Sequence, residues 1–221
     1  MLASRLEVLT DAEHLGLRIK AVIGGSGADR SNAIEQLVAG ALREFAPGEV
    51  AVISMLSDPS ASLGRYCHEH QVVSYMAPDA NSLKKALIAV KTCRQVFIET
   101  PDLMPSKGSQ DPALSLLIQQ RVSVAALLVL PCNAQTEYLA RLADHAEQLP
   151  VAGALITGLE EATSLGSILG VLVGHELPVA GISDVSNAEI VRITAEGLIN
   201  ESKRLARRNL DRKNQQLKVA V

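Results

Sequence analysis

Aromatic side chains and cysteines are scarce in this chain of 221 residues, which has no tryptophan and only 2% aromatic residues. Because 48% of the residues are nevertheless hydrophobic, the core must consist mainly of Leu, Val, Ile and Ala. A core of this kind suits a parallel sheet covered by helices. The three cysteines, Cys67, Cys93 and Cys132, are odd in number and lack metal-ligand spacing, which argues against a disulfide framework and a metal site.

The chain also lacks a strong net charge and a long apolar run. Its net charge of -3 gives no argument for binding to nucleic acid. No opening apolar segment resembles a signal peptide, and no stretch is long enough to span a bilayer. We therefore expect a cytoplasmic protein with one sizeable domain and no nucleic-acid partner.

Strand-like and helix-like segments alternate from residue 19 onward. The expected strands are short and mostly apolar, at residues 19–24, 49–54, 71–75, 95–99, 123–130, 151–157 and 179–182. The expected helices are at residues 31–45, 60–70, 81–91, 112–120, 135–148 and 163–172, and from 187 onward. This alternation predicts an α/β fold with a mostly parallel sheet, helices on both faces and ligands at the carboxyl ends of the strands.

A glycine-rich turn follows the first expected strand and opens the first expected helix, which is the geometry that cradles a phosphate. Against the P-loop pattern G-x-x-x-x-G-K-[ST], Gly24 matches the first glycine and Ser31 the hydroxyl that binds magnesium. Asp29 replaces the second glycine and Arg30 the lysine, while Gly27 lies inside the turn. Asp29 would repel phosphate, and Arg30 lacks the compact ammonium of lysine. Read alone, the segment favours a tight helix-capping turn.

Two later segments end expected strands with residues that resemble nucleotide motifs. The sequence E-T-P-D at residues 99–102 is similar to the D-T-P-G or D-T-A-G with which GTPases bind magnesium-linked water and sense the γ-phosphate. The sequence T-G-L-E at residues 157–160 stands in the place of the guanine-reading T-K-x-D, and a small-residue turn follows it at residues 161–167. With these residues, the chain resembles the GTPases of the signal recognition particle (SRP) type over residues 19–198, and among them the flagellar-placement branch, FlhF.

The resemblance implies a three-layer P-loop NTPase-like sandwich and a division of the chain into three parts. Residues 1–18 would be a short N-terminal helix, a reduced form of the family's N domain. Residues 19–199 would form the GTPase domain, and residues 200–221 a basic helical tail. The resemblance also puts Gly181 in the last nucleotide-facing loop, after the final strand.

The departures from the family's motifs fall on positions that face the nucleotide. Glu99 stands where the family has Asp, and Asp102 replaces a glycine whose N–H can meet the γ-phosphate. After Thr157, Gly158 replaces the lysine that covers the guanine, and Glu160 is longer than the Asp it replaces. The positions for magnesium, for γ-phosphate sensing and for base reading are therefore all altered.

These changes predict a site that rejects its nucleotide. We expect the carboxylates of Asp29, Glu99 and Asp102 to converge on one pocket and to repel a polyanion. Arg30 would pair with Asp29 or Glu99 and fill the site as a structural ion pair. No cofactor, catalytic residue or metal ligand is then expected, and GTP with magnesium would bind only if the site still functions.

The sequence thus predicts a degenerate SRP-type GTPase that acts as a non-hydrolysing binding module. By resemblance, it would help to place or regulate a flagellum or another polar surface machine, with an FlhF-like GTPase or a second copy of itself as partner. One alternative is a divergent NTPase that uses Arg30 and Ser31 on GTP or ATP. Another is a deviant P-loop positioning ATPase, although the missing signature lysine weighs against it.

Two charged segments outside these motifs each allow two interpretations. Residues 200–221 are basic, which fits a solvated helix end but also an arm for an acidic partner or for the anionic inner membrane at a cell pole. His68 and His70 are two residues apart and would point to different sides of a helix. We interpret them as part of a solvated helix end and not as metal ligands.

Overall fold

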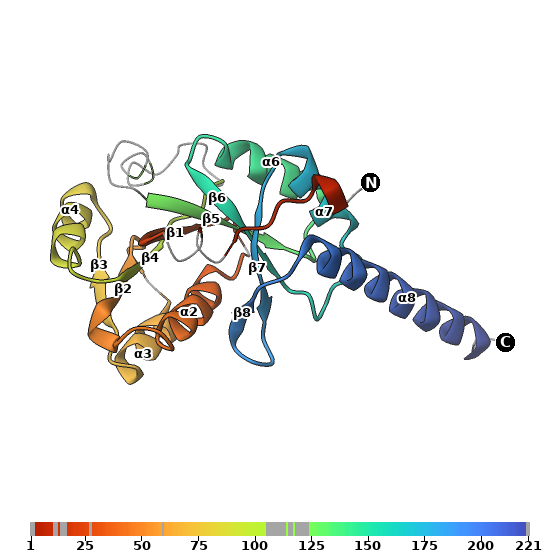
Figure 1. Ribbon diagram of the computed structural model, residues 1–221, viewed down its shortest axis with the longest axis horizontal. Helices are drawn as coiled ribbons and strands as arrows, with labels where there is room; N and C mark the ends of the chain where they lie inside the picture. Colours follow the sequence, from red (N-terminus) through yellow and green to blue (C-terminus); the bar gives the residue numbers. More distant parts are fainter. Residues whose placement is uncertain are drawn as a thin grey trace.

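The computed structural model describes residues 3–10, 13, 17–26, 28–58, 60–104, 114, 117 and 124–219, with 212–219 as backbone only. Figure 1 shows a central sheet between layers of helices. The strand order is β3-β2-β4-β1-β5-β6-β7-β8, and only the pair β7–β8 is antiparallel. The strands are β1 (Ile19–Ile23), β2 (Val50–Ser54), β3 (Val73–Met76), β4 (Gln95–Glu99), β5 (Val124–Pro131), β6 (Val151–Thr157), β7 (Val179–Asp184) and β8 (Glu189–Val191). The α/β fold with a mostly parallel sheet is therefore confirmed.

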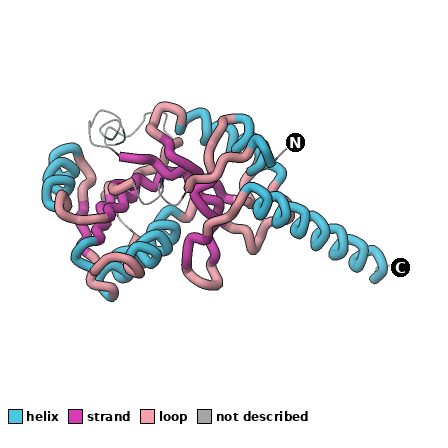
Figure 2. The backbone as a smooth tube through the Cα atoms, viewed as in Figure 1, coloured by secondary structure: helices cyan, strands magenta, loops and turns pink. Residues whose placement is uncertain are grey.

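Helices cover both faces of the sheet, as the backbone tube of Figure 2 shows. One face carries α2 (Arg30–Ala41) and α3 (Ala61–Glu69). The other carries α4 (Ala80–Ala89), α6 (Thr136–Ala146), α7 (Gly166–Gly174) and the start of α8 (Ala195–Val219). Two short 3-10 helices are η1 (Ala3–Arg5) and η2 (Pro47–Glu49).

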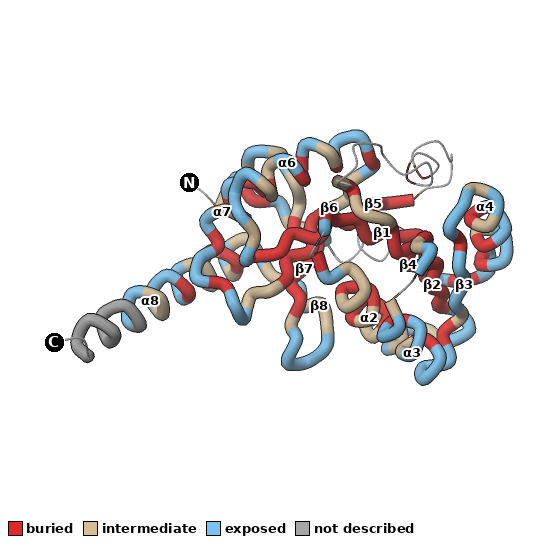
Figure 3. Tube along the Cα trace, turned by 180° about the vertical axis from the view of Figure 1, so that it is seen from behind, coloured by how far each residue is buried: buried red, intermediate tan, exposed pale blue. Residues whose placement is uncertain are grey.

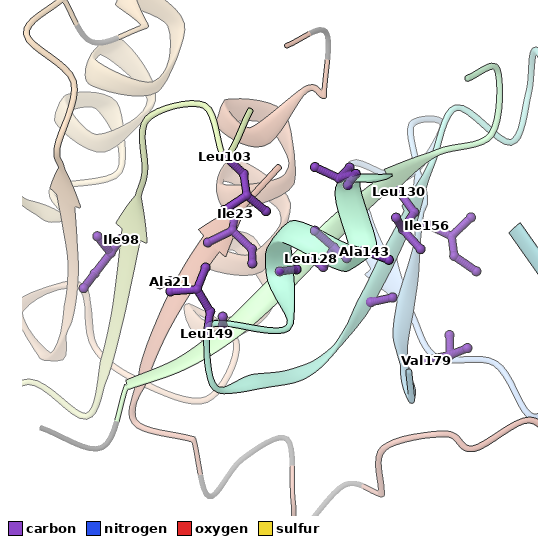
Figure 4. Close-up of a cluster of buried hydrophobic side chains, with 14 of the residues drawn as sticks. Ala21, Ile23, Ile98, Leu103, Leu128, Leu130, Ala143, Leu149, Ile156 and Val179 are labelled. Carbon is purple, nitrogen blue, oxygen red and sulfur yellow. The ribbon is translucent and has the colours of Figure 1, made fainter. Parts of the chain in front are cut away.

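The central strands are buried on both faces, which explains why their sequences are almost continuously apolar. In β1, Ala21 and Ile23 pack in the cluster under α4, α6 and α7, whereas Val22 packs in the cluster under α2 and α3. Figure 4 shows part of the first cluster, and Figure 3 shows that burial is concentrated in these strands. Lys20 is the charged exception in β1, since only 2% of it is exposed.

The N-terminal segment differs from its prediction as a helix. After η1, its backbone is extended and runs beside the start of β7. Leu9 N donates to Val179 O at 3.0 Å, and Val179 N donates to Glu7 O at 2.8 Å. Because β8 pairs only with residues 182–184 of β7, the first residues of β7 would otherwise keep an open edge. The helix predicted for residues 1–18 is thus wrong for residues 6–10 and 17–18, whereas residues 3–5 form the 3-10 helix η1 and residue 13 is helical.

The helix predicted from residue 187 onward begins instead at Ala195. Residues 184–188 form a turn in which Asp184 Oδ1 accepts hydrogen bonds from the backbone N–H groups of Ser186 (2.9 Å) and Asn187 (3.4 Å). The turn leads into β8, which the sequence did not predict. An Asp side chain that binds backbone groups two and three residues ahead favours a turn over a helix interior. The helix predicted at residues 112–120 lies largely outside the described residues.

Helix α8 is long and basic, and its first half packs against the rest of the domain. Leu198 and Leu205 are buried, and Arg208 Nη2 donates to Ala162 O at 3.1 Å. Its outer part points away from the sheet in Figure 1. No helix in the described part of the chain is both long enough and apolar enough to cross a membrane.

Gly153 in β6 lies where the sheet meets the N-terminal segment. A Cβ atom at this position would be 2.9 Å from Pro178 O, 3.0 Å from Leu9 Cδ1 and 3.2 Å from Ala180 Cβ. We expect Gly153→Ala to lower the free energy of unfolding by about 1–3 kcal/mol, because the backbone carbonyl cannot move away without disturbing the sheet. Urea denaturation measures the effect.

Gly170 provides the matched control for this substitution. It lies in α7, and a Cβ there has no heavy atom within 4 Å. Gly170→Ala should raise stability by up to about 1 kcal/mol, because alanine is the better helix former. If Gly153→Ala were as stable as the wild type, the close packing of β6 against the backbone of residue 178 would be contradicted.

Candidate functional site

The glycine-rich turn lies at the carboxyl end of β1, where the sequence predicts it. Gly24 and Gly25 are buried, whereas Asp29 is exposed. Asp29 caps α2, since its Oδ1 accepts the backbone N–H of Asn32 at 3.2 Å. Gly27 lies outside the described residues. Asp29 therefore has the helix-capping role that the turn alone suggested, and its carboxylate binds the end of α2.

Arg30 binds the turn that precedes it. Its Nη1 donates to the carbonyl oxygens of Gly24 (3.0 Å) and Gly25 (2.8 Å), and its Nη2 pairs with Asp102 Oδ1 at 2.7 Å. Its Nε is buried and has no hydrogen-bond partner among the described residues. An ion pair of Arg30 was expected with Asp29 or Glu99, and the structure corrects the partner to Asp102. The correction follows from the segment after β4, which returns to the turn so that Leu103 N donates to Gly24 O at 2.9 Å.

Glu99, at the end of β4, is 1% exposed and is held by two hydroxyl groups. Ser31 Oγ donates to its Oε1 at 2.6 Å, and Ser54 Oγ donates to its Oε2 at 2.5 Å. The Ser54 contact is absent from the sequence prediction, because it depends on β2 lying beside β4. The carboxylates of Asp29, Glu99 and Asp102 thus do not stand unpaired in a common pocket, as the sequence suggested. Each has its own partner inside the chain.

Tyr138 from α6 covers the beginning of the turn. Its hydroxyl donates to Ser26 O at 2.9 Å, and a Cβ atom at Gly25 would lie 2.0 Å from that hydroxyl oxygen. Only glycine at position 25 therefore lets the ring lie in this position. Burial, together with the negative charge of Asp102, raises the pKa of the Tyr138 phenol. Sequence reasoning missed this residue, and a tyrosine in an amphipathic helix carries no signal that would have revealed it.

The segment at the end of β6 makes its contacts with β5 and with the β7–β8 turn. Thr157 is nearly buried, and its carbonyl accepts Cys132 N at 2.8 Å. Gly158 has a positive φ of 70°, which suits glycine. Glu160 Oε1 accepts Val185 N at 3.3 Å, so Glu160 holds the β7–β8 turn. It also lines a cavity of about 410 Å³ beside α8.

Gly181 requires a correction, because it lies inside β7 and not in a loop after it. It pairs with Leu155 of β6, and a Cβ there would be 2.4 Å from Ile190 Cγ2. The physical reason for a glycine at this position is the side chain of Ile190 in the neighbouring strand β8, which fills the space that a Cβ would need. Gly181 is therefore a structural residue of the sheet edge.

Comparison with known proteins identifies the fold. No protein-family model matches the chain. Over 172 residues, or 75% of its length, it is 26% identical to the flagellar biosynthesis protein FlhF of Pseudomonas aeruginosa, and it spans 39% of that protein. It matches the crystal structure of FlhF with GMPPNP and Mg²⁺ at a TM-score of 0.76 and 20% identity, over 90% of this chain and 79% of that one. Chloroplast FtsY from Physcomitrella patens gives a TM-score of 0.72 and 17% identity, over 90% and 71% of the two chains.

The chain has the fold of the SRP-type GTPases, like the solved structures of FlhF and FtsY. In the sequence pattern, Arg30 aligns with the lysine of the P-loop, and Asp102 lies in the segment that resembles the γ-phosphate-sensing motif. The two side chains bind each other and the loop carbonyls, so the positive charge at the loop has an internal counter-ion.

One group of side chains in the described ranges of the chain could hold a metal ion. Asp144, Glu147 and His175 have possible ligand atoms within 4.8 Å of one another. His175 Nδ1 lies 3.1 Å from Glu147 Oε1 and 3.8 Å from Asp144 Oδ1. Both carboxylates are exposed, so the contacts with His175 account for the cluster. His68 and His70 are both exposed at the end of α3, with the His70 ring 4.3 Å from that of Tyr66.

Proposed function

We propose that this chain is a degenerate SRP-type GTPase domain that acts as a non-hydrolysing binding module. The observation that carries the proposal is the closed set of contacts from Arg30 to Asp102 and to the carbonyls of Gly24 and Gly25. In a working P-loop, positive charge and N–H groups converge on the phosphate. In this chain, the cation is neutralised by a carboxylate of the same domain.

The residues present do not fit a nucleoside triphosphate with magnesium. A phosphate that reached the loop would have to break the 2.7 Å ion pair of Arg30 and would then face the unpaired Asp102. Breaking one charge-assisted hydrogen bond costs about 1.5–3 kcal/mol. Each 1.4 kcal/mol lowers affinity about tenfold, so this exchange alone would weaken nucleotide binding by about ten- to a hundredfold.

A setting in flagellar or polar placement is part of the same proposal and rests on similarity to FlhF. The relative in Pseudomonas aeruginosa is a flagellar biosynthesis protein. A fold alone does not determine function, so we propose the partner by analogy: an FlhF-like GTPase or a second copy of this chain. The basic helix α8 would supply a contact with an anionic membrane surface.

Calorimetric titration with GTP, GDP and ATP, each with magnesium, tests the proposal. We expect no saturable heat from a sample that circular dichroism shows to be folded. Saturable binding of any of these nucleotides would contradict an empty site. Pull-down with an FlhF-like GTPase and measurement of the oligomeric state would then separate the two proposed partners.

A second candidate is a divergent, active NTPase, which one contact favours. Ser31 Oγ lies 2.6 Å from Glu99 Oε1, so the residue at the magnesium-binding hydroxyl position and the acidic residue at the end of β4 are still neighbours. Phosphate release from GTP or ATP decides between the two candidates. Turnover in the wild type that is lost in Ser31→Ala would support the NTPase.

A further inference from the structure

A cavity of about 210 Å³ lies away from the glycine-rich turn, near the amino ends of β1 and β4. Its walls come from the second half of α2, from β4, and from the β7–β8 hairpin. Leu37, Phe97, Ala180 and Ile190 are among the apolar residues that line it. The glycine-rich turn lies at the other end of β1, so this cavity is separate from the site described above.

Two amide side chains supply polar groups to this cavity. Gln36 of α2 lines it and is 2% exposed, yet Gln36 Oε1 has no hydrogen-bond partner among the described residues. Gln95 of β4 also lines it and is 4% exposed. Buried polar atoms are nearly always hydrogen-bonded, so an orphan carbonyl oxygen in the wall of a cavity indicates a missing donor.

Lys20 contacts Gln95 and puts a buried positive charge beside this cavity. Its Nζ donates to Gln95 Oε1 and lies 5.4 Å from the centroid of the Phe97 ring. Within the described ranges, no carboxylate lies within 4 Å of this ammonium; Glu44, which also lines the cavity, acts on it at longer range. Buried charges are usually paired closely, and Lys20 has only a neutral amide and an aromatic ring as near neighbours in the described residues, so an anion in the cavity would add a closer counter-charge than Glu44.

The hydrogen bond from Lys20 also determines how Gln95 can act. Because Gln95 Oε1 accepts from the ammonium, the amide N–H groups of Gln95 remain as donors toward the cavity. The cavity therefore offers a donor backed by a positive charge, and an acceptor in Gln36 Oε1. Arg43 and Arg192 line its solvent side, where Arg43 pairs with Glu189.

We propose that this cavity binds a small carboxylate that carries a hydroxyl or amine on the carbon next to the carboxylate. The carboxylate accepts from the Gln95 amide and neutralises the Lys20 charge across it. The hydroxyl or amine donates to Gln36 Oε1. A volume of about 210 Å³ is below the range of drug-sized pockets, which restricts the ligand to a few heavy atoms.

Protein-observed NMR of the ¹⁵N-labelled full chain tests this site with glycolate, lactate and glycine as probes. We expect saturable shifts of the side-chain amide signals of Gln36 and Gln95. Acetate, which lacks the donor, should bind at least about tenfold more weakly than glycolate. Propane-1,2-diol, which lacks the anion, should cause no saturable shift. If none of the three probes shifts these amides, or if acetate binds as well as glycolate, the proposal is wrong.

Two variants test the assigned contacts. Gln36→Leu removes the acceptor, and Lys20→Met removes the buried charge. Each should weaken glycolate binding by about tenfold or more, whereas Lys91→Met, which changes an exposed lysine, should leave it unchanged. Equal binding by all four proteins would mean that the shifts come from surface binding, and it would overturn the site. If a variant fails to fold, the comparison of the probes with acetate and propane-1,2-diol in the wild type still tests the site.

Discussion

A variant with Asp29→Gly, Arg30→Lys and Asp102→Gly should bind GTP or GDP with magnesium at least about a hundredfold more tightly than the wild type. The substitutions restore the second glycine and the lysine of the P-loop pattern, and they remove the carboxylate that pairs with Arg30 at 2.7 Å. The loop carbonyls of Gly24 and Gly25 would then hold a compact ammonium that can also reach a phosphate. Calorimetric titration of both proteins measures the gain.

The tighter binding has two causes: the substitutions remove carboxylates that repel the phosphates, and they free a lysine to make charge-assisted contacts with them. Two such effects of about 1.5–2 kcal/mol each give two to three powers of ten in affinity. Loss of the Asp29 cap costs only a few tenths of a kcal/mol, because glycine is itself an acceptable N-cap residue. The variant should therefore remain folded, which circular dichroism checks.

Ser31→Ala in the background of the three substitutions is the matched control. If Ser31 provides the magnesium-binding hydroxyl, this fourth change should reduce the recovered binding. A repaired chain that stays as inert as the wild type would show that the internal ion pair of Arg30 and Asp102 is not what excludes nucleotide. Tyr138, which lies against Gly25, would then be the next residue to change.

Replacing Lys20 by Met should change how stability depends on pH. Burial lowers the pKa of Lys20 to about 8 from 10.5, and the charge of Glu44 only partly opposes this effect. Below pH 8 the ammonium is charged in both the folded and unfolded states, and the folded state bears the full cost of burying it. Above pH 10.5 both states are neutral and that cost is gone. Wild-type stability should therefore rise relative to the variant as the pH increases from about 8 to 10.5.

The size of this relative change follows from the shift, since each pKa unit is about 1.4 kcal/mol. We expect about 3 kcal/mol between pH 7 and pH 10.5, measured by urea denaturation of both proteins at each pH. Leaving Gln95 Oε1 without its donor adds a cost that does not depend on pH in this range, so it does not affect the comparison. Lys91→Met should give a stability difference that stays nearly constant. A flat difference for Lys20→Met would mean that Lys20 is solvated or paired.

The buried strands were the most predictable part of the fold. The observed β4 and β6 have the predicted bounds, and β1 differs by one residue, because strands covered on both faces need unbroken apolar sequences. The elements at the edge of the sheet were missed or misplaced. Residues 7–9 and β8 both pair with β7, and a pairing partner so distant in sequence leaves no local pattern.

The candidate site was predictable in its residues and not in its contacts. Arg30 and Asp102 each departed from a known pattern, so the sequence identified them, but their pairing depends on the path of the chain after β4. Ser54 and Tyr138 follow no motif at all. They contact the site from positions 45 and 112 residues distant from their partners, and only the strand order brings them there.

The way α8 is attached determines how its outer part can meet another surface. Leu205 is the last residue of α8 that is fully buried in the described part of the chain, and the helix continues to Val219. At 1.5 Å per residue, its end lies about 20 Å beyond that anchor. Because Leu198 and Leu205 are both buried, the rotation of α8 about its own axis is fixed relative to the domain. A surface bound by its outer turns would therefore meet this domain at one distance and in one orientation.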